Sequence, residues 1–225
     1  MKFRNGYLTV PHEGGELSFQ YPAFNGTYGS VAEEIDKAGL KRPSSPETAS
    51  LVYDAWQTPD EKYSQEIISI LKNNWLWEFT GNLYLPKSNE KINNGVILDL
   101  DSQNLKFENG KLIMNKNSLV QRLKENDPLV KFVPFGFNPE EQTWQELSWN
   151  KYIIERYGEE GTQKIAEVAS KYKKIPYLWI LDSVHEEKIK LSVLGEGYNF
   201  LRGLVVYGNW EDGGNGNVFG IKKNS

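Results

Sequence analysis

Two aspartates, Asp99 and Asp101, flank a single leucine directly after the apolar run of residues 96–98. Carboxylates in an Asp-x-Asp pattern after a buried strand can hold Mg²⁺, and one of them can attack a phosphoryl group. This spacing makes the pair a candidate catalytic site. The alternative is a hairpin strand whose alternate residues face water, and we favour it because so short a motif often occurs without the activity.

The same segment resembles the first motif of the haloacid dehalogenase phosphatases, in which Asp99 would be the nucleophile and Asp101 the acid. The chain departs from the pattern of that family in two ways. Three predicted helices precede the motif, and no convincing Lys and Asp-Asp pair follows it. Glu211 and Asp212 are the remaining candidates for the later acidic pair. These four residues define one hypothesis, a carboxylate-dependent hydrolase acting on a phosphate ester or a glycan.

The segment 209–217 combines acids, side-chain amides and glycines in one run. Such oxygen ligands can bind Ca²⁺, but the pattern is not an EF-hand, because Gly214 occupies a ligand position and no bidentate glutamate follows. Loops carry binding residues disproportionately, so we predict a binding loop here. Its candidate ligand-binding residues are Trp210, Glu211, Asp212 and Asn215. The alternative is an exposed hairpin loop between two strands.

A second candidate binding element is the turn at residues 26–30, which runs into a predicted helix. Backbone N–H groups at Gly29 and Ser30 could bind a phosphate or a carboxylate there. The turn lacks the lysine of a P-loop and the third glycine of a dinucleotide fingerprint. We therefore favour the simpler interpretation, in which Ser30 caps the helix and pairs with Glu33 in a capping box.

The chain has no cysteine and two histidines, His12 and His185. Thiol chemistry is excluded, and Pro11 rules out a regular zinc-binding helix at His12. Asp182 and Ser183 lie close to His185 in sequence, but triads usually draw their members from separate segments, so we expect a polar β-turn. We predict no metal site and no cofactor.

Seven Trp, twelve Tyr and ten Phe make the chain rich in aromatic residues. Most of them should fill the core, because they fall on the apolar faces of predicted elements. The aromatics predicted to be buried are Trp56, Tyr63, Trp75, Trp77, Phe79, Trp144, Trp149 and Tyr172. Residues 132–137, with Tyr207 and Trp210, exceed what a core needs and predict an aromatic surface for a partner or a carbohydrate-like ligand.

Helix-start signals and apolar spacing predict three helices within residues 30–73 and a second helical cluster at 139–172. Pro46 is expected at the first helical position after Ser45, and a helix is expected to open at residues 138–141. Gly158 should end one helix of the second cluster.

Period-two alternation predicts strands between and after these clusters. One is predicted to begin at Trp75 with a single face in the core, and Gly81 is expected to mark a bulge in it. Residues 96–114 resemble a meander that ends in an Asn109-Gly110 hairpin turn. The prediction is an α+β fold with antiparallel or mixed sheets, in one domain of residues 1–225 with a weak subdivision near 86–94.

Overall composition limits the function further. The net charge is −4 with only five Arg, which argues against nucleic-acid binding. Mean hydropathy is −0.58, and neither a membrane-spanning run nor a signal region is evident, so we expect no membrane partner and a cytoplasmic location. No assembled catalytic set is present. The preferred prediction is a noncatalytic module that binds an unknown small molecule or protein.

Overall fold

A computed structural model describes residues 1–196, 203–211 and 213–223, and it confirms the predicted α+β class. Its helices are α1 (Tyr28–Lys37), α2 (Ser45–Gln57), α3 (Lys62–Asn73), α4 (Lys116–Lys124), α5 (Trp144–Trp149) and α6 (Lys151–Ser170). The strands up to residue 113 are β1 (Lys2–Arg4), β2 (Tyr7–His12), β3 (Gly15–Gln20), β4 (Phe24–Gly26), β5 (Leu76–Leu85), β6 (Gly95–Asp99), β7 (Lys106–Glu108) and β8 (Lys111–Ile113). The later strands are β9 (Val130–Pro134), β10 (Glu140–Glu141), β11 (Tyr177–Trp179), β12 (Lys188–Glu196), β13 (Leu204–Trp210) and β14 (Gly216–Val218).

The main sheet is mixed, with the strand order β10-β11-β13-β12-β5-β14-β4. β11 pairs with β13 in parallel and β14 pairs with β5 in parallel, whereas the other pairs of this path are antiparallel. β5 also pairs with β6, and β6 pairs with β9. The loop near residues 86–94 therefore joins two paired antiparallel strands. β1, β2 and β3 form a separate small sheet.

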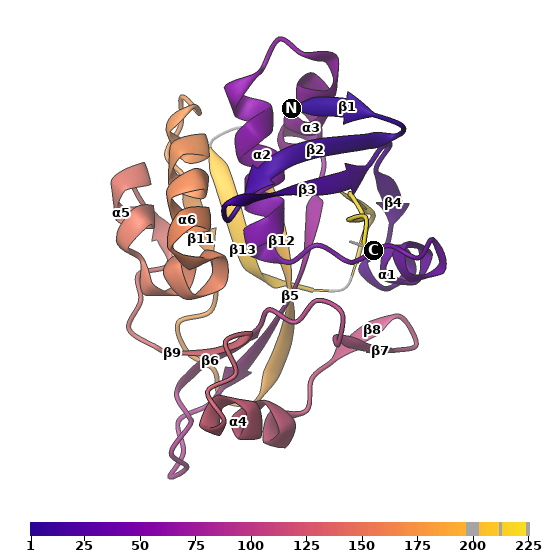
Figure 1. Ribbon diagram of the computed structural model, residues 1–225. Coiled ribbons are helices and arrows are strands. Elements are labelled where there is room, and N and C mark those ends of the chain that lie inside the picture. The colour runs from indigo at the N-terminus through magenta and orange to yellow at the C-terminus, as the bar shows by residue number, and fades with distance from the viewer. Residues whose placement is uncertain (197–202, 212, 224–225) are drawn as a thin grey trace.

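Helices α2 and α6 lie on one face of the main sheet, and the β1–β3 sheet lies outside α2 (Figure 1). Helix α1 packs on part of the opposite face, where its Tyr28 ring contacts Trp77 and Phe79 of β5. Because both faces are covered, every residue of β5 is buried. The prediction of one buried face for this strand was wrong: Glu78 and Thr80 are also buried.

Two helix starts differ from the predictions. Thr27, not Ser30, is the N-cap of α1, and its side chain accepts a hydrogen bond from the Ser30 backbone N–H. Ser44, one residue earlier than predicted, caps α2 and forms a capping box with Glu47. At α1 the Thr27 hydroxyl reaches a first-turn N–H group, whereas at α2 the Ser44 backbone N–H and hydroxyl both donate to Glu47 Oε2.

The second cluster begins later than predicted. Residues 140–141 form β10, which pairs with β11, and the capping box of Thr143 with Glu146 starts α5 instead. Trp144 and Trp149 are 45% and 79% exposed, so their predicted burial was wrong. The reason is that this six-residue helix buries only Leu147. The break at Gly158 is confirmed by its positive φ of 69° within α6.

The Asn109-Gly110 turn is confirmed, since both residues have positive φ between β7 and β8. The predicted meander was wrong, because β7 and β8 pair with each other in a separate sheet while β6 pairs with β5 and β9.

A bulge at Gly81 is confirmed by a register shift: Lys190 pairs with Asn82, but Ser192 pairs with Glu78. Among the described residues, no helix is both long and apolar enough to cross a membrane.

Candidate functional site

Five aromatic rings form a connected cluster on the sheet face opposite α2 and α6, and we call this cluster the aromatic face. Its members are Trp75, Tyr177, Trp179, Tyr207 and Trp210. Ring centroids lie 4.5 Å apart for Trp75 and Trp210, 5.2 Å for Tyr207 and Trp210, and 6.1 Å for Trp179 and Tyr207. Tyr207 is buried, whereas Trp179 is 42% exposed. The cluster thus extends from the core to the surface.

Strand register explains why Tyr207 and Trp210 lie together. Residues three apart on a regular strand point to opposite faces. Here Tyr207 pairs with Val193 and Trp210 pairs with Leu191, so β13 contains one more residue than β12 over this stretch. This β-bulge restores both rings to one face, which is a recognised way in which bulges redirect side chains.

The loop after Trp210 returns to the same cluster. The Asn217 backbone N–H donates to the Trp75 carbonyl at 2.7 Å, and β14 then pairs with β4 and β5. The interpretation of residues 209–217 as a hairpin loop was therefore wrong, because β13 and β14 are not neighbours. Asn215 is exposed in this loop, and Asp212 lies outside the described residues.

Glu211 forms an ion pair with Lys190 of β12, with 2.5 Å between Oε1 and Nζ. This hydrogen bond and the charge of Lys190 hold the pKa of Glu211 below its usual range. The exposed carboxylate and the largely buried lysine stem form a charged pair that joins the end of β13 to β12. Lys190 was not recognised from the sequence, because its partner becomes apparent only when β12 and β13 are paired.

Residues 132–137 do not join the aromatic face, contrary to the prediction. Phe135 stacks on Tyr84, and Phe137 contacts Tyr152 of α6. These contacts lie on the helical side of the sheet, within the larger core cluster. Alternation alone could not place them, because the direction of this segment depends on where α6 packs.

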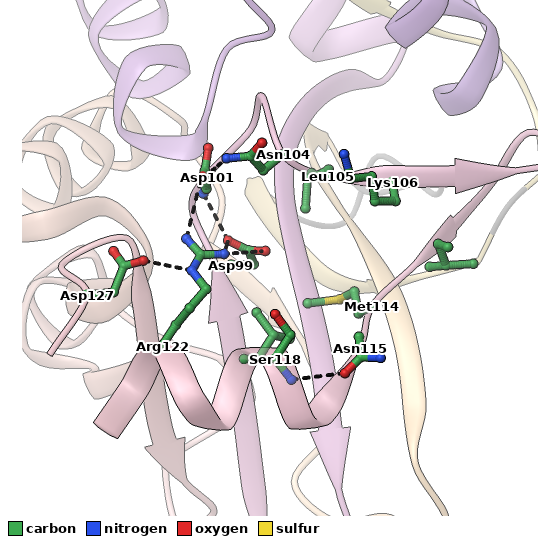
Figure 2. Close-up of a pocket in the computed structure, with 12 residues that line it drawn as sticks. Asp99, Asp101, Asn104, Leu105, Lys106, Met114, Asn115, Ser118, Arg122 and Asp127 are labelled. Carbon is green, nitrogen blue, oxygen red and sulfur yellow. Dashed lines mark hydrogen bonds and ion pairs between the residues drawn. The ribbon is translucent and has the colours of Figure 1, made fainter. Parts of the chain in front are cut away.

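The Asp99 and Asp101 side chains do converge, in a cavity of about 580 Å³ between β6, the β7–β8 hairpin and α4 (Figure 2). Both contact one guanidinium: Arg122 Nη1 lies 3.2 Å from Asp99 Oδ1, and Nη2 lies 3.3 Å from Asp101 Oδ2. Arg122 Nε also donates to Asp127 Oδ2 at 2.7 Å. Three carboxylates therefore surround one arginine, which was not recognised as a site residue from the sequence.

The carboxyl groups of this cavity differ in their pKa. Burial raises the pKa of Asp99, although Arg122 and the Asp101 backbone N–H act in the opposite direction. The Leu129 N–H and Arg122 lower the pKa of Asp127. The guanidinium occupies the space between the carboxylates, where the phosphatase resemblance would require Mg²⁺. Within the described ranges, no group of three or more His, Asp or Glu residues is arranged to hold a metal ion.

Gly29 and Ser30 lie in the first turn of α1, against the β7–β8 hairpin. A Cβ on Gly29 would lie 2.3 Å from the Gly110 carbonyl oxygen, so the missing side chain permits this close approach. The Ser30 hydroxyl donates to the Thr27 carbonyl at 3.0 Å. These contacts give both residues a role in packing, and their role in anion binding stays a prediction.

Neither described histidine belongs to a catalytic triad or a zinc site. Ser183 donates to Asp182 at 3.1 Å in an exposed segment that also contains an exposed His185. His12 Nδ1 lies 2.9 Å from the Ser50 hydroxyl oxygen, and Ser50 is buried in α2. The first segment is an exposed polar loop in which the predicted β-turn is not assigned, and the second contact joins the β2–β3 hairpin to α2.

No protein-family model matches this chain, and no curated protein matches it. A solved structure described as the accommodation of massive sequence variation in Nanoarchaeota by the C-type lectin fold is similar, with a TM-score of 0.62 and 18% sequence identity. The match covers 91% of this chain and 98% of that chain. At this identity the likeness concerns the fold alone, and the chain shares the C-type lectin fold.

Proposed function

We propose that this chain is a noncatalytic binding module in which the aromatic face and the adjoining loop of residues 211–216 hold a small molecule or a protein. The observation that carries the proposal is the connected row of five rings across β11, β13 and Trp75, the residue before β5. Trp and Tyr provide large contact areas at a low cost in side-chain entropy, and they dominate the energetics of many interfaces.

The surroundings of the rings support the same proposal. Glu211 presents an exposed carboxylate directly after Trp210 in the chain, and Asn215 presents an exposed amide in the same loop. An apolar centre with a polar rim is typical of protein interfaces. The similar structure is described as accommodating massive sequence variation on this fold, and a scaffold that tolerates such variation suits a binding module.

The proposal can be tested with two substitutions on the aromatic face and one matched control. Binders to the wild-type protein would be selected from a random-peptide display library and from a glycan array. Trp179→Ala and Trp210→Ala should each weaken the selected binders at least about tenfold, in the range of interface hot spots. Trp149→Ala removes an exposed tryptophan of α5 and should leave their affinity unchanged.

Titration of each selected binder against the wild type and the three variants measures the affinities and distinguishes the outcomes. Binders that tolerate Trp179→Ala and Trp210→Ala, or that depend on Trp149, would place recognition elsewhere on the molecule. The folded state of each variant would be checked by thermal unfolding, because Trp210 also packs on Trp75 and Tyr207.

The alternative proposal is carboxylate-dependent hydrolysis in the cavity at Asp99. One observation favours it: burial raises the pKa of Asp99, while hydrogen bonds lower the pKa of Asp127. Two carboxyl groups whose pKa values differ in this way suit the roles of a general acid and a general base. The pairing of both groups with Arg122 speaks against it. Turnover of p-nitrophenyl phosphate or p-nitrophenyl glycosides by the wild type, lost in Asp99→Asn, would establish this activity.

Three further expectations belong to the proposal. The absence of a cofactor and of a nucleic-acid partner is expected from the residue inventory and the net charge of −4, and a cytoplasmic location is the default expectation. A membrane partner is likewise not expected from the sequence.

A further inference from the structure

Two consecutive backbone carbonyls of β13 accept hydrogen bonds from side chains on the helical side of the sheet. The Tyr207 carbonyl accepts a hydrogen bond from Arg156 Nη1 at 2.8 Å, and the Gly208 carbonyl accepts one from the Tyr84 hydroxyl at 2.9 Å. Both carbonyls lie at the bulge, where the ladder between β12 and β13 changes register. A bulge interrupts regular strand pairing, so its backbone groups need other partners.

Arg156 is itself fixed by the layer of helices. It is fully buried and forms an ion pair with the fully buried Glu78 of β5. Its Nε donates to the Ser45 hydroxyl, and its Nη1 donates to the Tyr152 hydroxyl, both at 3.0 Å. A buried ion pair carries a large desolvation cost and often contributes little net stability. Its contacts do, however, define one direction for the guanidinium.

The absence of a side chain at Gly208 brings α6 against the bulge. A Cβ on this glycine would lie 1.9 Å from the Tyr152 hydroxyl oxygen. That hydroxyl donates to Asn82 Oδ1 at 2.6 Å, and Asn82 Nδ2 donates to the Ser192 hydroxyl at 2.9 Å. Ser192 is the β12 residue between the two ladder pairs that flank the bulge. Three strands and one helix therefore meet at this point.

We propose that Arg156 and Tyr84 are positioning residues for the aromatic face. They hold the bulge from the helical side and thereby keep Tyr207 and Trp210 on the same side of β13. If β13 were regular here and had no bulge, these two rings, three residues apart, would point to opposite faces of the strand. The effect on ligand affinity rests on the proposed function, whereas the effect on ring geometry does not.

The test uses Tyr84→Phe, which removes the hydroxyl that donates to Gly208 and keeps the ring. The control is Tyr21→Phe, which removes a hydroxyl that donates to Glu66 of α3, away from Arg156 and β13. The Trp75 and Trp210 rings are close enough to give an exciton couplet in circular dichroism. The couplet is assigned to this pair by its loss in Trp210→Phe. We expect Tyr84→Phe to reduce the couplet and to weaken face-directed peptide binders about three- to tenfold.

Tyr21→Phe should lower the unfolding midpoint to a similar extent but retain both the couplet and the affinity. Glu78→Gln provides a second probe, because it removes the charge that orients Arg156, and it should also reduce the couplet. The inference is overturned if Tyr84→Phe and Glu78→Gln keep the wild-type couplet. It is also overturned if the couplet of all three variants, the control included, decreases in proportion to the loss in unfolding midpoint. A wild type that binds no probe at the aromatic face, with a couplet that still depends on Tyr84, would refute the proposed function and leave the positioning role supported.

Discussion

Gly29 of α1 lies directly against Gly110 of the β7–β8 turn, so closely that a Cβ on Gly29 would be 2.3 Å from the Gly110 carbonyl oxygen. The neighbouring atom is backbone, which cannot move aside as a flexible side chain can. This contact connects the helix that covers part of the sheet to the hairpin that borders the Asp99 cavity.

Gly29→Ala should destabilise the protein because of this contact. Higher helix propensity would favour alanine by about 1 kcal/mol, but the overlap with Gly110 should cost about 1–3 kcal/mol or more. Urea unfolding measures the difference. Gly213→Ala is the control, since a Cβ there has no neighbour within 4 Å and should change stability by no more than about 0.5 kcal/mol. Equal effects of the two substitutions would contradict the packing role of Gly29.

Thr27→Ala should cost about 0.5–2 kcal/mol of unfolding free energy, because Thr27 is the N-cap of α1. Ser30→Ala should cost less, since the exposed Ser30 hydroxyl bonds only to Thr27 in the same turn, to its carbonyl and its hydroxyl, and caps no backbone N–H group. Chemical denaturation of both variants checks the order. A larger loss for Ser30→Ala would reverse the assignment, and saturable stabilisation of the wild type by sulfate that Gly29→Ala abolishes would support an anion site.

Local signals account for the parts of the fold that the sequence predicted well. Capping residues and apolar stripes lie within one helix, so the helices within residues 45–73 and the break at Gly158 could be read directly. The strand order could not, because β12 and β5 lie between β13 and β14 in the sheet although β14 follows β13 in the chain. Glu78 alternates with apolar neighbours as a water-facing residue would, yet it is buried because α6 brings Arg156 to it.

The candidate site was predicted in part for the same reason. Trp210 and Tyr207 were recognised as surplus aromatics, but their shared face depends on a register shift that involves β12. The Gly208-Asn209 pair within an otherwise apolar strand was the available signal, since glycine inside a strand often marks a bulge. Arg122 carries no motif of its own, and only the fold brings it to Asp99.

Asp127→Asn should reduce stability in a pH-dependent way. Hydrogen bonds from Leu129 N–H and Arg122 lower the pKa of Asp127 in the folded state. A lowered pKa contributes stability that is present above the ordinary carboxyl pKa and is lost as the pH falls through the lowered value. At neutral pH we expect a loss of about 1 kcal/mol, as for a partly exposed charged pair.

Urea unfolding of wild type and Asp127→Asn across the acid range checks this expectation, with the exposed Glu108→Gln as control. The difference between wild type and Asp127→Asn should shrink as the pH falls. A difference that stays constant down to strong acid would show that Asp127 is not held by these contacts.

Arg122→Gln should convert the Asp99 cavity into a site that responds to divalent cations. In the wild type the guanidinium contacts Asp99, Asp101 and Asp127, so added Ca²⁺ or Mg²⁺ and a chelator should leave the melting temperature unchanged. Without the guanidinium, three carboxylates share one cavity and repel one another. Oxygen ligands of this kind suit Ca²⁺, so Ca²⁺ should raise the melting temperature of Arg122→Gln saturably. Arg4→Gln, at an exposed position of β1, should show no such response. Cation stabilisation of the wild type, or its absence in Arg122→Gln, would show that the arginine does not stand in for a metal between these carboxylates.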